Sequence, residues 1–238
     1  MTPRKGEAPA PAIQSVQRAA RLLTLFTVDE PELSLRQITA GMGMSKATAH
    51  RYATALRDAG LLRLSRGLYS LGPRIVELAP VALAGLAVVE LAGPYMRELV
   101  SETEQTAVLS VWDGEAPIVV RVDENTGRIV RIVVATGSRL PLDSAQGRVF
   151  SAFVADAPDP PEAAEVRAER IASNAQVVEG ISALAVPIFQ GEEIVATLAL
   201  VGTTSALEDS PRGPLAKSLR RQGDALSAQL GFVESGTE

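Results

Sequence analysis

The chain has 238 residues, which suits one large domain or two of ordinary size. Hydrophobic residues make up 46% and charged residues 21%, so the composition supports a packed core and excludes wholesale disorder. Cysteine is absent, which excludes disulfides, zinc–thiolate sites and cysteine nucleophiles and is compatible with a cytoplasmic location.

The net charge of −5 conceals an uneven distribution. Residues 1–72 hold ten Lys and Arg against five Asp and Glu, a charge of +5. Residues 73–238 hold thirteen against twenty-three, a charge of −10, and the two parts sum to −5. A basic first third favours a DNA-binding module joined to a part that stays off DNA, although chance patchiness of a mixed surface would give the same split.

Residues 1–12 lack the apolar segment of a signal peptide. We predict that they form a disordered tail. The most lipid-like run, residues 78–89, has twelve uncharged residues and includes Pro80. A membrane span needs about 18 to 20 residues, so we expect none.

The next segment predicts a helix-turn-helix. Ser15–Thr27 forms a first amphipathic helix, with its apolar residues recurring on one face. Ser34 caps a short second helix over Leu35–Met42, and the turn Gly41–Met44 leads into a third helix. Two helices joined by a short turn that contains glycine are typical of this motif.

The third helix, Ser45–Gly60, is the predicted recognition helix. Ser45 is a suitable N-cap, and Gly60 can take the left-handed position that ends a helix. One apolar stripe faces the core, formed by Ala49, Tyr52, Ala53 and Leu56. The opposite face is small, hydroxylated and basic, as a helix in the major groove requires, and comprises Ala47, Arg51 and Thr54 with Thr48 and His50 on its flanks.

Residues 61–71 alternate around Arg66-Gly67, which predicts a tight β-hairpin. A hairpin directly after a recognition helix is the wing of a winged helix, so Arg63 and Arg66 are expected to face phosphates. The domain predicted from these elements covers residues 13–73. Residues 74–104 predict linker helices, broken by proline and glycine, that also pack against a partner subunit.

From Thr106 the sequence pattern predicts an α+β domain over residues 105–234. Strands are expected at Thr106–Trp112, Pro117–Asp123 and Ile129–Ala135 as an antiparallel meander, with Ile118, Val120 and Val122 on one side of the second strand. Further elements are expected in the order helix from Asp143 or Ser144 to Phe153, charged helix Glu162–Ala172, hairpin Ile181–Gln190 and Glu193–Gly202, and closing helix Pro211–Phe232.

In order and spacing, several motifs resemble those of IclR-type transcriptional regulators. They are Ser15–Ala19, Ser45–Arg51, Asp58–Leu61, Tyr69–Pro73, Leu140–Leu142, Gly147-Arg148 and Ala185–Phe189. The resemblance extends from Ser15 to Phe232. It implies an N-terminal winged helix-turn-helix, a linker helix that dimerises and a C-terminal GAF-like effector domain. It also implies homodimers, often paired into tetramers, on palindromic double-stranded DNA operators.

Residue by residue, Ser45, Thr48 and Arg51 match DNA-facing positions of the family. Ser45 and Thr48 are expected to contact phosphates, while Arg51 is the candidate for reading a guanine edge. The complete predicted DNA interface comprises Ser34, Arg36, Ser45, Lys46, Ala47, Thr48, His50, Arg51, Thr54, Arg63 and Arg66.

The family's effector pocket lies between the sheet and the loop before the Gly-Arg helix. Backbone N–H groups at Ala145 and Gln146 could hold an anion at the helix N-terminus. Positions that some relatives fill with Cys or Ser are Ala183, Ala199 and Val201 here, so we expect a larger, less polar ligand with an aromatic part. Arg131 could pair with an acid if it faced inward. The predicted site comprises Ile129, Arg131, Leu140, Ser144, Ala145, Gln146, Ser173, Ala183, Ala199 and Val201.

The sequence therefore predicts a sequence-specific DNA-binding regulator, a repressor, whose operator affinity responds to a small-molecule effector. One alternative is a regulator with a vestigial pocket that works by oligomerisation alone. Another is a repressor fused to a hydrolytic domain, but the single histidine, His50, lies in the recognition helix. We predict no catalytic residues, cofactor, metal or membrane partner.

Overall fold

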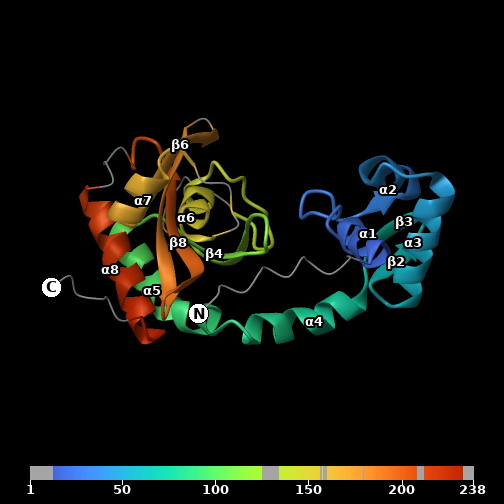
Figure 1. Ribbon diagram of the computed structural model, residues 1–238, viewed down its shortest axis with the longest axis horizontal. Coiled ribbons are helices and arrows are strands. Elements are labelled where there is room, and N and C mark those ends of the chain that lie inside the picture. The colour runs from blue at the N-terminus through green and yellow to red at the C-terminus, as the bar shows by residue number, and fades with distance from the viewer. Residues whose placement is uncertain are drawn as a thin grey trace, which may run out of the picture. The chain divides into compact units, whose positions relative to one another are not determined.

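The computed structural model describes residues 13–124, 134–155, 157, 160–178, 180–207 and 212–232. Contacts divide the chain into two units, Met1–Ala82 and Leu83–Glu238, and each is described by itself (Figure 1). The division falls inside the segment assigned to the linker, 74–104, because the second part of that segment is buried within the C-terminal unit.

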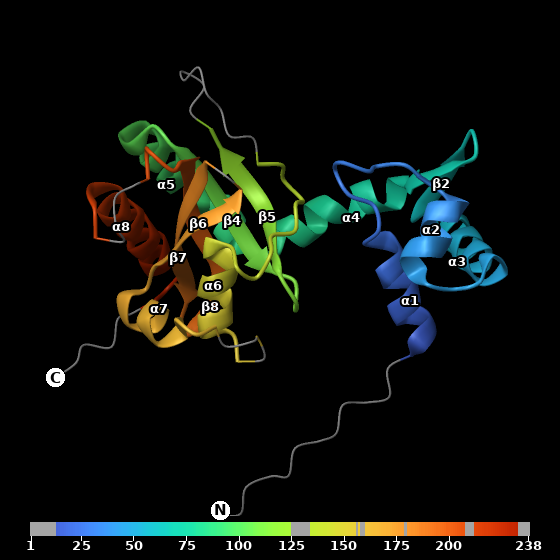
Figure 2. The ribbon, with the colours of Figure 1, turned by 90° about the horizontal axis from the view of Figure 1, so that it is seen from above.

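Three helices and a small sheet form the core of the N-terminal unit (Figure 2). The helices are α1 (Gln14–Leu23), α2 (Leu35–Met42) and α3 (Lys46–Asp58). The strands are β1 (Leu33–Ser34), β2 (Leu62–Ser65) and β3 (Leu68–Leu71), and they pair antiparallel in the order β1-β3-β2. Their shared core consists mainly of Leu22, Ile38, Met42, Ala49, Ala53, Leu56, Leu62 and Tyr69.

The predicted helix-turn-helix and hairpin are present. Helix α2 has the predicted bounds, and Gly60 takes a φ of 75° directly after the last turn of α3. Strand β1 was not predicted, because a strand of two residues shows no periodicity. It forms only through its pairing with Tyr69 and Leu68.

Two helices follow the hairpin, α4 (Pro73–Ala84) and α5 (Ala87–Thr103). Helix α5 contributes Val88, Ala92, Met96 and Leu99 to the core of the C-terminal unit. Among the described residues, no single helix is long and apolar enough to cross a membrane. The one combination that passes by length and composition joins α4 to α5 across a sharp bend.

The C-terminal unit is built on a five-stranded antiparallel sheet. Its strands are β4 (Thr106–Trp112), β5 (Pro117–Asp123), β6 (Ala172–Val178), β7 (Ile181–Gln190) and β8 (Glu193–Thr203), in the order β5-β4-β8-β7-β6. Helices α5 and α8 (Pro214–Gln229) pack on one face. Helices α6 (Ala145–Phe153) and α7 (Ala163–Glu169) pack on the other face (Figures 1 and 2).

The two faces have separate cores, because side chains alternate along each strand. Leu109, Leu184, Val186, Leu198 and Leu200 face α5 and α8. The opposite face is lined by smaller residues under α6 and α7: Val108, Val119, Ala172, Ala185, Ala199 and Val201. Ala183, Ala199 and Val201 of the predicted effector site lie on this second face, under α6 and α7.

Two predictions about this unit need correction. The charged helix predicted over Glu162–Ala172 ends at Glu169, and Ala172 begins the unpredicted strand β6. Val122 does not share a face with Val120, because the β4–β5 register shifts between Leu109 and Ser110. The antiparallel pairing of β4 with β5 agrees with the first two strands of the predicted meander, and β8 is the other neighbour of β4. Most of the predicted strand Ile129–Ala135 lies outside the described residues.

Candidate functional site

Helix α3 buries the stripe that its sequence pattern predicts and exposes a basic, hydroxylated face. Ala49 and Ala53 are fully buried, and Leu56 is 6% exposed. Thr48 is half-buried, while the exposed positions of the predicted face are Lys46, Ala47, His50 and Arg51. No ion pair within the described chain involves Lys46 or Arg51, so both charges are available to an anionic partner.

Hydroxyl groups fix the start of both helices of the motif. Ser45 Oγ accepts a hydrogen bond from the Thr48 N–H at 3.2 Å and lies 2.9 Å from Thr48 Oγ1. Ser34 and Gln37 form a reciprocal capping box at the start of α2, and Arg36 is exposed in the same turn. Ser34, Ser45 and Thr48 therefore hold the helix termini that would approach DNA.

The hairpin carries the two predicted wing arginines on its exposed surface. Arg63 Nε donates to Ser70 Oγ at 2.7 Å, which directs its side chain along the hairpin. Arg66 and Gly67 form the tip, with φ values of 51° and 83°. Two consecutive positive φ values are typical of the tight type I′ turn, and Arg66 is exposed at this turn.

Thr54 does not point freely outward as the helical wheel predicts. It is half-buried, and its Oγ1 is fully buried without a hydrogen-bond partner among the described residues. The reason is tertiary: α1 packs beside α3, and Thr54 lines the groove between these two helices. A helical wheel of α3 alone contains no information about α1.

In the C-terminal unit, the structure brings several predicted effector positions onto one sheet face. Ala183 pairs with Val201, and Ala199 pairs with both Ala185 and Val108. Leu140 is half-buried and packs into the same apolar cluster. Ile129 and Arg131 lie outside the described residues, so their predicted roles stay predictions.

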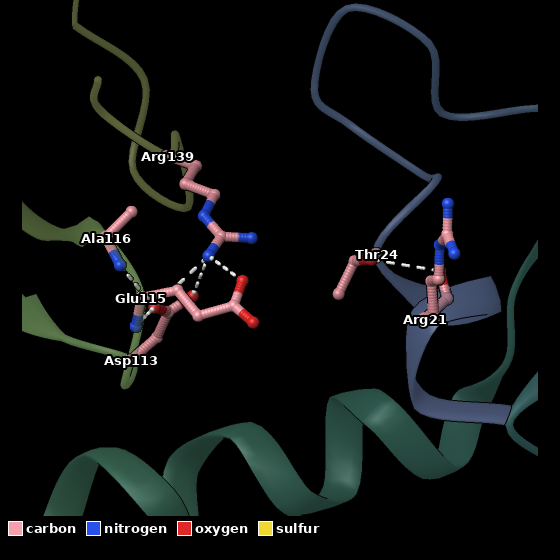
Figure 3. Close-up of polar contacts among 6 residues, drawn as sticks. All are labelled: Arg21, Thr24, Asp113, Glu115, Ala116 and Arg139. Atoms are coloured by element: carbon pink, nitrogen blue, oxygen red, sulfur yellow. Dashed lines mark hydrogen bonds and ion pairs between the residues drawn. The ribbon is translucent and has the colours of Figure 1, made fainter. Parts of the chain in front are cut away.

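The loop before α6 is anchored at both ends. The Leu140 N–H donates to the Pro117 carbonyl at 2.8 Å. Arg139 Nη2 lies 2.8 Å from Glu115 Oε2 and 3.3 Å from Asp113 Oδ2, which ties the loop to the β4–β5 turn (Figure 3). Asp113 Oδ1 also accepts the backbone N–H groups of Glu115 and Ala116, each at 2.8 Å.

Ser144 serves as the N-cap of α6, and its hydroxyl both donates and accepts a hydrogen bond within the protein. Its hydroxyl accepts the Gly147 N–H at 3.0 Å and donates to the Pro141 carbonyl at 2.6 Å. Ala145 and Gln146 are buried behind it. Ser144 therefore shapes the loop, and the first-turn N–H groups of Ala145 and Gln146 remain the candidates for holding an anion.

Arg148, which the sequence analysis noted only as part of a motif, joins three elements. Its Nε donates to the Asp143 carbonyl at 3.1 Å, and its Nη1 donates to the Ser173 carbonyl at 3.3 Å. Its guanidinium also pairs with Glu162 at 3.1 Å. It thereby holds the start of α6 against β6 and α7.

Ser173 lies apart from the other predicted effector positions. It is exposed and pairs with Leu184, which belongs to the core on the α5–α8 face. Its neighbour Asn174 is buried, pairs with Ala183 and donates to the Asp143 carbonyl. The strand period of two decides this, and it was missed because no strand was predicted between the charged helix, which was expected to end at Ala172, and Ile181.

Two buried hydroxyls on the α6 face were also missed. Ser110 and Thr197 are both fully buried, and they face each other as register partners of β4 and β8. Neither hydroxyl has a hydrogen-bond partner among the described residues. Alternation from Val108 and Ala199 could have placed both residues on this face.

These features define the class of protein. A capped recognition helix, a three-helix core and a hairpin with an arginine at its tip form a winged helix-turn-helix DNA-binding module. This module is joined to an α/β domain. Helices cover both faces of its sheet, and the face under α6 and α7 carries small residues. The chain is a DNA-binding transcriptional regulator.

Comparison with known proteins identifies the family. Residues 15–66 match the IclR helix-turn-helix domain, and residues 81–159 match the bacterial transcriptional regulator IclR C-terminal domain. The chain belongs to the IclR family of transcriptional regulators, as the sequence motifs predicted.

Relatives are similar over almost their whole length. The HTH-type transcriptional regulator XynR of Escherichia coli K12 is 28% identical, over 93% of this chain and 99% of XynR. A putative IclR transcriptional regulator from Silicibacter sp. TM1040 superposes with a TM-score of 0.78 at 24% identity, over 92% of this chain and 97% of that one. An IclR homologue from Microbacterium hydrocarbonoxydans, crystallised with 4-hydroxybenzoate, has a TM-score of 0.71 at 21% identity, over 91% and 99%.

Proposed function

We propose that this protein is a repressor that binds a palindromic operator as a homodimer, paired further into a dimer of dimers, in the cytoplasm. The observation that carries the proposal is the exposed face of α3, where Lys46, His50 and Arg51 project beside a hydroxyl-capped helix N-terminus. Arg51 reads a guanine edge, while Ser45, Thr48, Arg63 and Arg66 position the module on phosphates.

Dimerisation is supported by the apolar surface of α4. Val76 is 72% exposed and Val81 is 70% exposed, and Leu78 is exposed on the same helix. Large apolar side chains gathered on one exposed helix are typical of a protein–protein contact. We infer that α4 of a second copy of the chain covers this surface. Such a dimer would present two recognition helices to the two half-sites of an operator.

The effector site that we propose is the α6 face of the sheet, next to the start of α6. Ala183 and Ala199 place small apolar side chains on this face, and the first-turn N–H groups of Ala145 and Gln146 suit a carboxylate. A small organic molecule with an aromatic body and an acidic group matches these features. A ligand there changes operator affinity only through unequal binding to two states of the dimer.

A regulator with a vestigial pocket is the second candidate, and one observation favours it. Ala199 is fully buried and Val201 is 8% exposed within the packed α6-side cluster, as expected for ordinary core positions. No catalytic step is part of either candidate, since the only imidazole lies on α3. Turnover of any ligand by the purified protein would contradict both.

The DNA-binding proposal is tested by selecting binding sites from random double-stranded DNA with the full chain, then comparing the wild type with Arg51→Ala. We expect inverted half-sites for the wild type. The variant should lose about 1 to 3 kcal/mol and become tolerant at one base pair of each half-site. Unchanged affinity and selectivity would show that Arg51 does not read a base.

The effector proposal is tested by thermal shift with 4-hydroxybenzoate and related aromatic acids, because a protein of this fold was crystallised with that compound. A hit should be lost in Ala183→Leu, which places a bulkier side chain on the proposed face of β7, and kept in the matched control Ala225→Leu on the exposed side of α8. No hit, together with intact operator binding, would favour the vestigial pocket.

A further inference from the structure

A groove of about 750 Å³ runs between α1 and α3 in the N-terminal unit. Figures 1 and 2 show the two helices side by side. Two residues of α1 line it, Ser15 and Arg18, which lie three positions apart and therefore on one helix face. The wall formed by α3 consists of Thr48, His50, Arg51, Tyr52, Thr54, Ala55 and Asp58.

The groove is continuous with the proposed recognition surface, because Thr48, His50 and Arg51 belong to both. A DNA strand that follows α3 along the major groove must therefore pass the mouth of this groove. Arg18 is the only residue of α1 that would bring a charged side chain to that path. Arg18 belongs to the motif Ser15–Ala19. DNA reading by the recognition helix alone does not explain this motif.

The charges favour an anion. No ion pair within the described residues involves Arg18 or Arg51, whereas Asp58, the acid at the far end, is paired with Arg57 at 3.0 Å. Asp58 follows Arg51 by seven residues, so it lies about 10 Å further along the helix. The start of α1 adds the partial positive charge of a helix N-terminus at Ser15.

We propose that this groove binds the sugar–phosphate backbone of the operator and that Arg18 is a positioning residue that contacts a phosphate. The proposal rests on α3 being the recognition helix. Arg51 would read the base while Arg18, from the neighbouring helix, fixes how deeply and at what angle α3 enters the major groove. A guanidinium suits this contact because phosphate binding needs charge and hydrogen-bond donors but no base contact.

The test compares three variants of the full chain by fluorescence anisotropy on the selected operator and on unrelated DNA over a range of salt concentrations. Arg18→Ala should weaken binding to both DNAs by the same factor, roughly tenfold near 0.1 M salt. It should also lower the slope of log affinity against log salt by about 0.9 for each Arg18 that contacts phosphate. Arg18→Lys, which keeps the charge, should restore most of the slope.

Arg21→Ala is the matched control, because Arg21 is exposed on the same helix and does not line the groove. The backbone carbonyl of Arg21 accepts a hydrogen bond from the Thr24 hydroxyl at 2.9 Å (Figure 3). Both alanine variants remove one charge from α1, so long-range electrostatics change alike. An unchanged melting temperature for each would show that the fold is kept.

Equal behaviour of Arg18→Ala and Arg21→Ala would overturn the groove proposal. An altered sequence preference in Arg18→Ala would overturn the phosphate contact in favour of base reading. Arg51→Ala, measured alongside, separates the two proposals. If Arg51→Ala loses selectivity while Arg18→Ala matches its control, the recognition helix stands and only the groove is rejected.

Discussion

The backbone of Gly147 lies directly against the carbonyl group of Leu142, so close that a Cβ on residue 147 would overlap the backbone of residue 142. The neighbour is backbone rather than the end of a flexible side chain, so it cannot move without displacing the loop before α6. This contact gives the Gly147-Arg148 motif a physical reason: glycine lets the loop close on the helix, and Arg148 then fastens it to β6 and α7.

Gly147→Ala should therefore destabilise the C-terminal unit by about 1 to 3 kcal/mol through overpacking. Gly93→Ala is the contrast, because a Cβ there would meet the guanidinium of Arg121, which can shift. Urea unfolding followed by circular dichroism measures both. A cost for Gly147→Ala no larger than that for Gly93→Ala would contradict the backbone contact.

The tip of the wing combines local strain with an exposed charge. Arg66 has a φ of 51°, a conformation that asparagine tolerates better than arginine. Arg66→Asn should raise the free energy of unfolding by several tenths of a kcal/mol while weakening DNA binding and lowering its salt slope by about one. Thermal melts and anisotropy would measure the two effects, and a variant that binds DNA as well as the wild type would remove Arg66 from the interface.

The exposed apolar surface of α4 predicts a separable effect on assembly. Val76→Glu combined with Val81→Glu should leave each unit folded, since both side chains are mostly exposed in the single chain. The charges should prevent a second copy from covering this surface, giving monomers in sedimentation velocity and weaker binding to a two-half-site operator. An unchanged oligomeric state would place the dimer contact elsewhere.

Glu169 predicts a pH dependence of stability. Arg212 donates a hydrogen bond to it at 2.6 Å and lowers the pKa of the Glu169 carboxyl below its ordinary value of 4.5, and Arg220 lowers it further. Because the pKa is lowered in the folded state, the stabilisation is complete above about pH 4.5 and is lost as the pH falls through the folded pKa. The effect is small, since solvent screens these groups.

Glu169→Gln should accordingly lower the melting temperature slightly at neutral pH and converge with the wild type in acid. Melting curves of the two proteins between neutral pH and pH values below 4.5 measure this difference. A gap that stayed constant over the whole range would mean that the ionised carboxylate is not the stabilising group.

Much of this protein was determined locally and could be predicted from sequence. Ser34, Ser45 and Ser144 cap the helices that follow them, because a cap depends on atoms within three residues. The bounds of α2, β4, β5 and β7 follow from periodicity together with local capping and turn residues. The buried stripe of α3 follows in the same way, since a helix with one apolar face has one way to pack it.

Tertiary structure decided the rest, because those features depend on partners distant in sequence. Strand β6 exists because its backbone pairs with β7. In that pairing Asn174 lies on the α6 face of the sheet, whereas the predicted Ser173 lies on the opposite face. The register shift in the β4–β5 pair separates Val122 from Val120. The packing of α1 against α3 places Thr54 in a groove, and the same packing brings Arg18 and Arg51 to that groove although 33 positions separate them in the sequence. The sequence by itself identified a recognition helix; the packing of α1 against it determined which further side chains can share its surface.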